Sequence, residues 1–241
     1  MILLVYDTPE ELAEAAARDF ATRAEEAIRE RGRFAVVLAG GSTPKVTYDA
    51  LVRDYADELD WSRAHVFFGD ERTVDPEHED SNYRMVRESL LSRITVGSVH
   101  RMRCELPPEE AVADYERQLG EFFGPDETPS FDLILLGLGG DGHTASLFPE
   151  TSALDVTGRR VIVNPVLKLG TSRLTLTLPV INAARAVTFL VAGEDKAGAL
   201  HEVLEGEADP RAYPAKLVSP ESGDLTWMAD QAAAQYLDKP M

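Results

Sequence analysis

The stretch from Phe131 to Pro149 reads FDLILLGLGGDGHTASLFP, and it decides how the rest of the chain can be interpreted. Its first half, up to Leu138, is a continuous apolar run bounded by glycine, which is typical of a strand buried on both faces of a sheet. Its second half sets Asp141 and His143 among three glycines, where the backbone is free to take positive φ and a ligand can approach closely. Histidine is also the residue type best suited to proton transfer near neutral pH. We therefore expect a reactive site here, with an ordinary tight turn as the alternative.

Composition limits the classes of protein to consider. The 241 residues are 44% hydrophobic, enough for one large α/β domain with a sizeable core. A formal charge of −18 argues against nucleic acid and anionic membranes as partners, so an anionic substrate would need a local cluster of Arg and Lys. The single cysteine, Cys104, excludes an internal disulfide and a thiolate metal site. With no apolar run long enough to span a membrane and no signal-peptide pattern, we expect a cytoplasmic protein.

Strand-like and helix-like segments alternate along most of the chain. Thr8 is expected to cap a helix that carries Leu12 to Ile28 on one face and ends at Gly32. Arg173 to Leu178 alternates polar and apolar residues, which favours an antiparallel or edge strand. The other expected strands are 1–6, 34–39, 64–68, 131–138, 161–163, 186–192 and 214–218, and the other expected helices are 44 onward, 81–91, 107–123, 196–204 and 225–237, the last capped by Asp224.

This alternation predicts a single domain over residues 1–241 with a doubly wound, mostly parallel, Rossmann-like sheet and helices on both faces. Ligands of such sheets bind beyond the carboxyl ends of the strands. Four expected strands end in glycine-rich or charged segments, and the fold would place these side by side. They are Gly40 to Thr43, Gly69 to Arg72, Gly137 to His143 and Gly193 to Lys196.

The segment GGSTP at residues 40–44 can form a cup of donors for a phosphate. Thr43 is expected to cap a helix that begins at Pro44, leaving hydroxyls and free amides to face outward. An ordinary strand-to-helix connection explains the segment equally well. Asp70 and Arg72 follow the third expected strand and can point into the same crevice as His143, while Asn82 either caps its helix or turns inward. The charged run 77–80 is expected to be a solvated loop and not a metal site.

Three other chemistries fit poorly. The sequence GLGGDG at 137–142 matches GxGxxG, but Pro149 interrupts the chain soon afterwards and no second strand follows promptly, which disfavours a dinucleotide site. A serine hydrolase would need a GxSxG turn, which the chain does not contain. Cys104 has neither a glycine-rich nor a helix-start context, which disfavours a thiol nucleophile.

Six segments together carry a family resemblance, which extends over nearly the whole chain. They are GGSTP at 40–44, GDER at 69–72, SN at 81–82, LGLGGDGHTASLFP at 136–149, RLTLTLPVIN at 173–182 and GEDKA at 193–197. The chain resembles the glucosamine-6-phosphate isomerase/6-phosphogluconolactonase family. The lactonase members are the better match, and they imply hydrolysis of 6-phospho-D-glucono-1,5-lactone to 6-phosphogluconate in the oxidative pentose phosphate pathway, without a cofactor or metal. Glucosamine-6-phosphate deaminase shares the fold and is similar through GGSTP, the Asp of the third strand and DGH.

Two departures separate the chain from the deaminase pattern. That pattern has a glutamate five residues after the histidine, where this chain has Phe148, and a tyrosine where this chain has Arg72. Isomerising an amino sugar needs additional acid–base groups, whereas opening a lactone needs an activated water and charge stabilisation. A non-catalytic sugar-phosphate sensor is a further alternative, but the chain keeps His143 and carries no basic helix-turn-helix.

From this resemblance we hypothesise a role for each candidate site residue. His143 acts as the general base on water, and Asp141 or Asp70 orients His143 or the water. The substrate is a small phosphosugar lactone, and the protein is a monomer or small homo-oligomer. The residues expected to bind the substrate and its phosphate are Gly40, Gly41, Ser42, Thr43, Arg72, Asn82, Gly140, Arg173 and Lys196.

Overall fold

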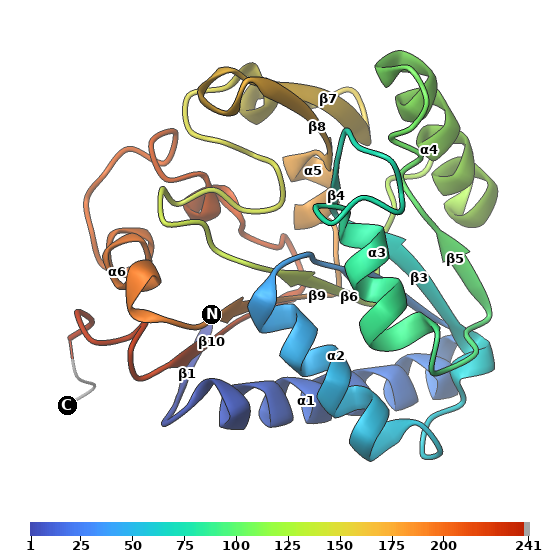
Figure 1. Ribbon diagram of the computed structural model, residues 1–241, viewed down its shortest axis with the longest axis horizontal. Coiled ribbons are helices and arrows are strands. Elements are labelled where there is room, and N and C mark those ends of the chain that lie inside the picture. The colour runs from blue at the N-terminus through green and yellow to red at the C-terminus, as the bar shows by residue number, and fades with distance from the viewer. Residues whose placement is uncertain (239–241) are drawn as a thin grey trace.

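The computed structural model describes residues 1–238 and is built on a seven-stranded sheet, in which every neighbouring pair of strands is parallel (Figure 1). The strands lie in the order β1-β10-β9-β6-β2-β3-β5. Their bounds are β1 Ile2–Tyr6, β2 Phe34–Leu38, β3 Ala64–Phe68, β5 Ser98–His100, β6 Leu133–Leu136, β9 Ala186–Val191 and β10 Asp224–Asp230. The predicted doubly wound, mostly parallel α/β fold is therefore confirmed.

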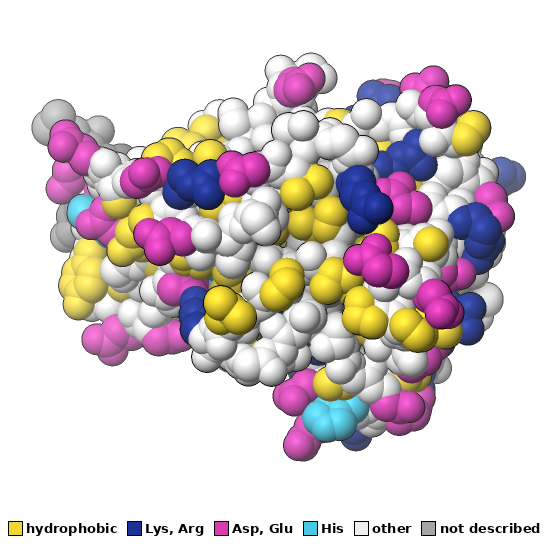
Figure 2. All heavy atoms as spheres, turned by 90° about the horizontal axis from the view of Figure 1, so that it is seen from above, with side chains coloured by type: hydrophobic (Ala, Val, Ile, Leu, Met, Phe, Trp, Pro, Cys, Tyr) yellow, Lys and Arg dark blue, Asp and Glu magenta, His cyan; other side chains and the backbone are white. Residues whose placement is uncertain are grey.

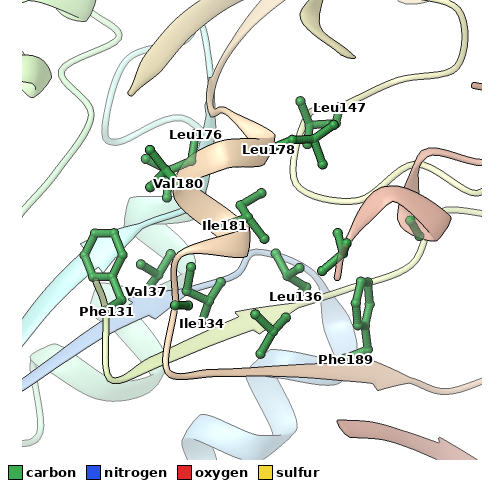
Figure 3. Close-up of a cluster of buried hydrophobic side chains, with 14 of the residues drawn as sticks. Val37, Phe131, Ile134, Leu136, Leu147, Leu176, Leu178, Val180, Ile181 and Phe189 are labelled. Carbon is green, nitrogen blue, oxygen red and sulfur yellow. The ribbon is translucent and has the colours of Figure 1, made fainter. Parts of the chain in front are cut away.

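Helices cover both faces of this sheet and bury two separate hydrophobic clusters. Alternate residues of each strand contribute to opposite clusters: in β2, Val37 belongs to one and Val36 to the other. Figure 3 shows the first cluster, where Ile181 points towards Ile134 and Leu136, and Val180 lies beside Leu176. The helices are α1 Pro9–Arg31, α2 Ser42–Tyr55 and α3 Asn82–Val86 on the side of the second cluster, and α4 Pro108–Phe123, α5 Leu178–Asn182 and α6 Ala197–Leu204 on the side of the first.

Local sequence signals set the ends of α1 as predicted. The Thr8 hydroxyl accepts a hydrogen bond from the Glu11 amide at 3.1 Å, and the Glu11 carboxylate accepts one from the Asp7 amide at 3.1 Å. Gly32 ends the helix at φ 73°, in the left-handed region that favours glycine. The amphipathic face and its two caps agree, which is why this helix could be predicted well.

A second, three-stranded sheet lies above the carboxyl ends of the main one (Figure 1). It is antiparallel, in the order β4 Asp70–Arg72, β8 Thr171–Leu176 and β7 Val161–Val166. The antiparallel alternative for the alternating segment 173–178 is thus confirmed, with Leu174 and Leu176 buried. The strand ends two residues early, because Leu178 already begins α5, a helix that was not predicted.

Two expectations near the carboxyl end are wrong. Residues 225–237 do not form a helix capped by Asp224; Asp224–Asp230 is β10, held between β1 and β9 with Trp227 and Met228 buried. Residues 214–218 do not form a strand, since Pro214–Leu217 is a 3₁₀ turn. In both cases non-local packing overrides the local pattern.

One expected helix differs from the observed structure in detail. The expected helix 81–91 is α3 followed by a π-helical turn, Arg87–Leu91.

Figure 2 shows acidic side chains scattered over the face seen there with arginines and lysines interspersed, in keeping with the net charge of −18. Within residues 1–238, no helix combines the length and the apolar character needed to span a bilayer.

Candidate active site

A cavity of about 530 Å³ lies at the carboxyl ends of the parallel strands. The loops that follow β2, β3, β6 and β9 all contribute to its wall, as expected for a doubly wound sheet. Every residue that the sequence predicted for the site lines it: Gly40, Gly41, Ser42, Thr43, Asp70, Arg72, Asn82, Gly140, Asp141, His143, Arg173 and Lys196.

The loop after β2 presents the start of α2 to this cavity. Gly41, at φ 107°, is the residue before the helix, and no side chain caps it. Thr43 is therefore not the cap, and the helix begins at Ser42 and not at Pro44. Because no side chain within residues 1–238 caps the start of α2, its first amides can serve as donors to an anion. A side chain at Gly40 is excluded, since a Cβ there would lie 1.8 Å from the Asn82 Oδ1.

Asp70 is held by two neighbours, Asn82 at the start of α3 and Ser146 in the loop after β6. Its Oδ1 accepts from the Asn82 Nδ2 at 3.2 Å, and its Oδ2 accepts from the Ser146 hydroxyl at 2.6 Å. Asn82 turns inward, because Ser81 is the residue that caps α3, accepting from the Arg84 amide at 3.1 Å. Both oxygens of Asp70 are thus bonded to groups other than His143.

Asp141 is the carboxylate that contacts His143. Its Oδ1 lies 2.5 Å from the His143 Nδ1 and also accepts from the His143 amide at 3.2 Å. Gly142, at φ 77°, makes the turn between them. A Cβ on Gly139 would lie 2.0 Å from the His143 Nδ1, so glycine is required there.

This contact fixes the tautomer of the neutral imidazole. An ionised carboxylate can only accept, so Nδ1 carries the proton and Nε2 of the neutral ring is left as an acceptor. Burial alone raises the pKa of Asp141, but its hydrogen bonds with His143 and Lys168 outweigh this and hold the pKa well below its usual range. The arrangement can therefore take a proton from water at Nε2.

Cationic side chains occupy the other walls of the cavity. Arg72 and Arg173 lie directly opposite each other in the β4–β8 pair. Burial and then the charge of Arg72 lower the pKa of Arg173. Lys196 follows the turn at Gly193, whose amide donates to both oxygens of Asp230 at 3.1 Å.

Comparison with known proteins places this geometry in a family. The sequence profile of the glucosamine-6-phosphate isomerases/6-phosphogluconolactonase family matches residues 7–227. The chain belongs to this family. It is 48% identical over 221 residues to the 6-phosphogluconolactonase of Synechocystis sp., covering 90% of each chain. It is 40% identical to the 6-phosphogluconolactonase of Homo sapiens, covering 99% of this chain and 95% of the other.

Two solved structures share the fold of this chain. The 6-phosphogluconolactonase from Trypanosoma cruzi superposes with a TM-score of 0.88 at 28% identity, covering 99% of this chain and 97% of the other. A monomeric glucosamine-6-phosphate deaminase superposes with a TM-score of 0.78 at 24% identity, covering 98% and 99%. At that identity the deaminase shows likeness of fold alone.

Three residues of this family member's cavity were not predicted from the sequence as site residues. Ser146 bonds to Asp70, and Phe148 stacks on His143 with ring centroids 4.2 Å apart and planes 24° apart. Lys168, at the tip of the β7–β8 hairpin, donates to the Asp141 Oδ2 and lies 5.0 Å from the centre of the Phe148 ring. Ser146 and Phe148 belong to the quoted motif and could have been found there, but no sequence signal links Lys168 to a loop 27 residues away.

Proposed function

We propose that the chain hydrolyses 6-phospho-D-glucono-1,5-lactone to 6-phospho-D-gluconate, the second step of the oxidative pentose phosphate pathway. The names of relatives at 40–48% identity support this reaction. The observation that carries it for this chain is the contact between Asp141 and His143 at the edge of a cavity that is also lined by four cationic side chains. A neutral histidine that can act as a base, next to cationic side chains that can bind a phosphate, suits a substrate that is a phosphorylated ester.

In the proposed mechanism, His143 Nε2 takes a proton from a water molecule as its oxygen attacks the lactone carbonyl carbon. The resulting tetrahedral oxyanion collapses, the bond from the carbonyl carbon to the ring oxygen breaks, and the imidazolium returns its proton to that oxygen. Asp141 keeps the imidazole in the required tautomer. The product carries a new carboxyl group and a free hydroxyl, and His143 ends neutral.

The phosphate of the substrate would be held by the cations and by the start of α2. Arg72, Arg173 and Lys196 supply positive charge, which a protein of net charge −18 must concentrate locally. Ser42 and Thr43 supply amides and hydroxyls, while Gly40, Gly41 and Gly140 allow close approach of the substrate. In this proposal Asp70 and Asn82 fix the polar wall of the cavity through the hydrogen bond between their side chains.

The deaminase alternative is not favoured. Phe148 packs its ring on His143, at the position where the deaminase pattern carries a glutamate, so the acid–base group needed for an amino sugar is missing there. The sensor alternative would not require the Asp141–His143 pair, which is built into the turn by two glycines.

The test is hydrolysis of freshly made 6-phosphogluconolactone, corrected for spontaneous opening, with glucosamine 6-phosphate as a parallel substrate. His143→Ala should lower kcat by about 10²- to 10⁴-fold, the usual contribution of a general base. His78→Ala is the matched control, because His78 is exposed on the acidic loop. Ammonia release from the amino sugar would support the deaminase, and tight phosphosugar binding without turnover would support the sensor.

A further inference from the structure

Lys168 reaches the Asp141–His143 pair from outside the central turn. Its ammonium donates to Asp141 Oδ2 while His143 Nδ1 contacts Oδ1, so the carboxylate bridges a cation and the imidazole. The same ammonium lies 5.0 Å from the centre of the Phe148 ring, which stacks on His143. Lys168, Asp141, His143 and Phe148 form a continuous contact group, called the dyad cluster below.

Lys168 contacts Asp141 from the tip of a hairpin. It lies in the short 3₁₀ turn Leu167–Leu169 at the tip of the β7–β8 hairpin, between Leu167, which is 92% exposed, and Leu169, which lines the cavity. Gly170, at φ 61°, closes that turn. Among the ion pairs found within residues 1–238, Asp141 is the only carboxylate that Lys168 contacts. The hairpin therefore places the Lys168 ammonium against the Asp141 carboxylate.

Two physical consequences follow for the base. First, the Asp141 side chain is a third exposed, and the contact of the Lys168 ammonium with its Oδ2 restricts the rotation of the carboxylate that contacts His143. Second, a fixed positive charge disfavours protonation of the nearby imidazole and also competes with the imidazolium for Asp141. Both effects keep Nε2 free to accept a proton.

We propose that Lys168 is a positioning residue for the base, which holds Asp141 against His143. This proposal rests on the lactonase function proposed above. It assigns Lys168 to the dyad cluster and not to the set of phosphate-binding cations. It also connects the tip of the β7–β8 hairpin to the Asp141–His143 pair.

The charged and titratable groups around His143 come from several elements, and all of them must be considered in a test by pH. Asp141 faces the ring from its own loop and Lys168 from the hairpin. Tyr213 packs behind Gly142, where an added Cβ would meet its ring at 2.5 Å. The other charged groups in the cavity wall are Asp70, Arg72, Arg173 and Lys196.

The experiment compares the full-length wild type with Lys168→Met, Lys168→Arg and the matched control Leu167→Ser. We expect Lys168→Met to lower kcat at pH 7 roughly tenfold, with a smaller change in KM, and to move the acid limb of the pH–rate profile upward by about one pH unit. Lys168→Arg should restore most of the rate and the position of the limb, because it keeps the charge. Leu167→Ser should match the wild type.

A second measurement separates this proposal from the proposed function. The ring signals of His143, followed by NMR against pH, should titrate at higher pH in Lys168→Met than in the wild type, whatever the protein hydrolyses. If the wild type does not open the lactone, the proposed function fails and the NMR result still tests Lys168. If Lys168→Met raises KM alone, with kcat, the acid limb and the His143 titration unchanged, Lys168 binds substrate and the proposal is overturned.

Discussion

Arg72 and Arg173 lie directly opposite each other across the antiparallel β4–β8 pair, at the wall of the active-site cavity. Like charges opposite each other in a sheet are destabilising, and burial of Arg173 adds to the cost, as the lowered pKa of its guanidinium shows. Such a pair becomes favourable when an anion lies between the two guanidinium groups. In the proposed function, this pair would bind the phosphate of the substrate.

Arg173→Met should weaken binding of the phosphorylated lactone and leave the chemistry less affected. The loss of one charged hydrogen bond, about 1.5–3 kcal/mol, corresponds to a rise in KM of roughly 10- to 100-fold. Inorganic phosphate should also raise the thermal midpoint of the wild type more than that of the variant. Arg63→Met is the control, because Arg63 is exposed beside the amino end of β3. Equal phosphate stabilisation of Arg173→Met and the wild type would show that this pair does not bind the anion.

Glu71→Gln should destabilise the wall of the cavity. Glu71 is 3% exposed and accepts from the amides of Arg72, Asn82 and Tyr83 at 2.7–2.8 Å. A glutamine replaces one acceptor oxygen by a donor, so at least one buried amide loses its partner, at a cost of about 1–3 kcal/mol in the free energy of unfolding. Urea unfolding measures it, with the exposed Glu79→Gln as control. Equal midpoints for the two variants would count against this account of Glu71.

Asp141→Asn should have a pH-dependent effect on stability. The folded-state pKa of Asp141 is lowered, so the ionised carboxylate stabilises the fold at pH values above its unfolded pKa of 3.8, and this contribution is lost as the pH falls below that value. The difference in unfolding free energy between the wild type and Asp141→Asn should be present at pH 5, and it should shrink as the pH falls from 4 to 3. Urea unfolding across that range checks the sign. A difference that grows on acidification would mean that the pKa is raised instead.

The sequence predicted most of the main sheet because its signals are local. The buried runs at β2, β3, β6 and β9 are apolar on both faces, and each is followed closely by glycine. Parallel strands bring their carboxyl ends to one edge, so the order of segments along the chain was enough to place the four loops and the predicted site residues together. The cap at Thr8 and the left-handed Gly32 were likewise decided by residues within one turn of the helix ends.

The sequence failed where a segment's state depends on distant partners. The local pattern at residues 225–237 predicted a helix with Asp224 as its cap, but residues 224–230 form β10 because they pair with β1 and β9. The choice between Asp70 and Asp141 as partner of His143 was also open, since both follow buried strands. In the structure Asp141 contacts His143 Nδ1, whereas the oxygens of Asp70 accept from Asn82 and Ser146.

The sequence by itself determined that this is a doubly wound α/β protein with a histidine, carboxylates and cations at one edge of its sheet. The physical reason is that hydrophobic periodicity, glycine positions and helix caps act over a few residues. Only the tertiary structure decided which of these groups touch. The Arg72–Arg173 pair arises from strand register, and the Lys168–Asp141 contact from where a hairpin tip comes to lie, and both depend on packing between segments far apart in the chain.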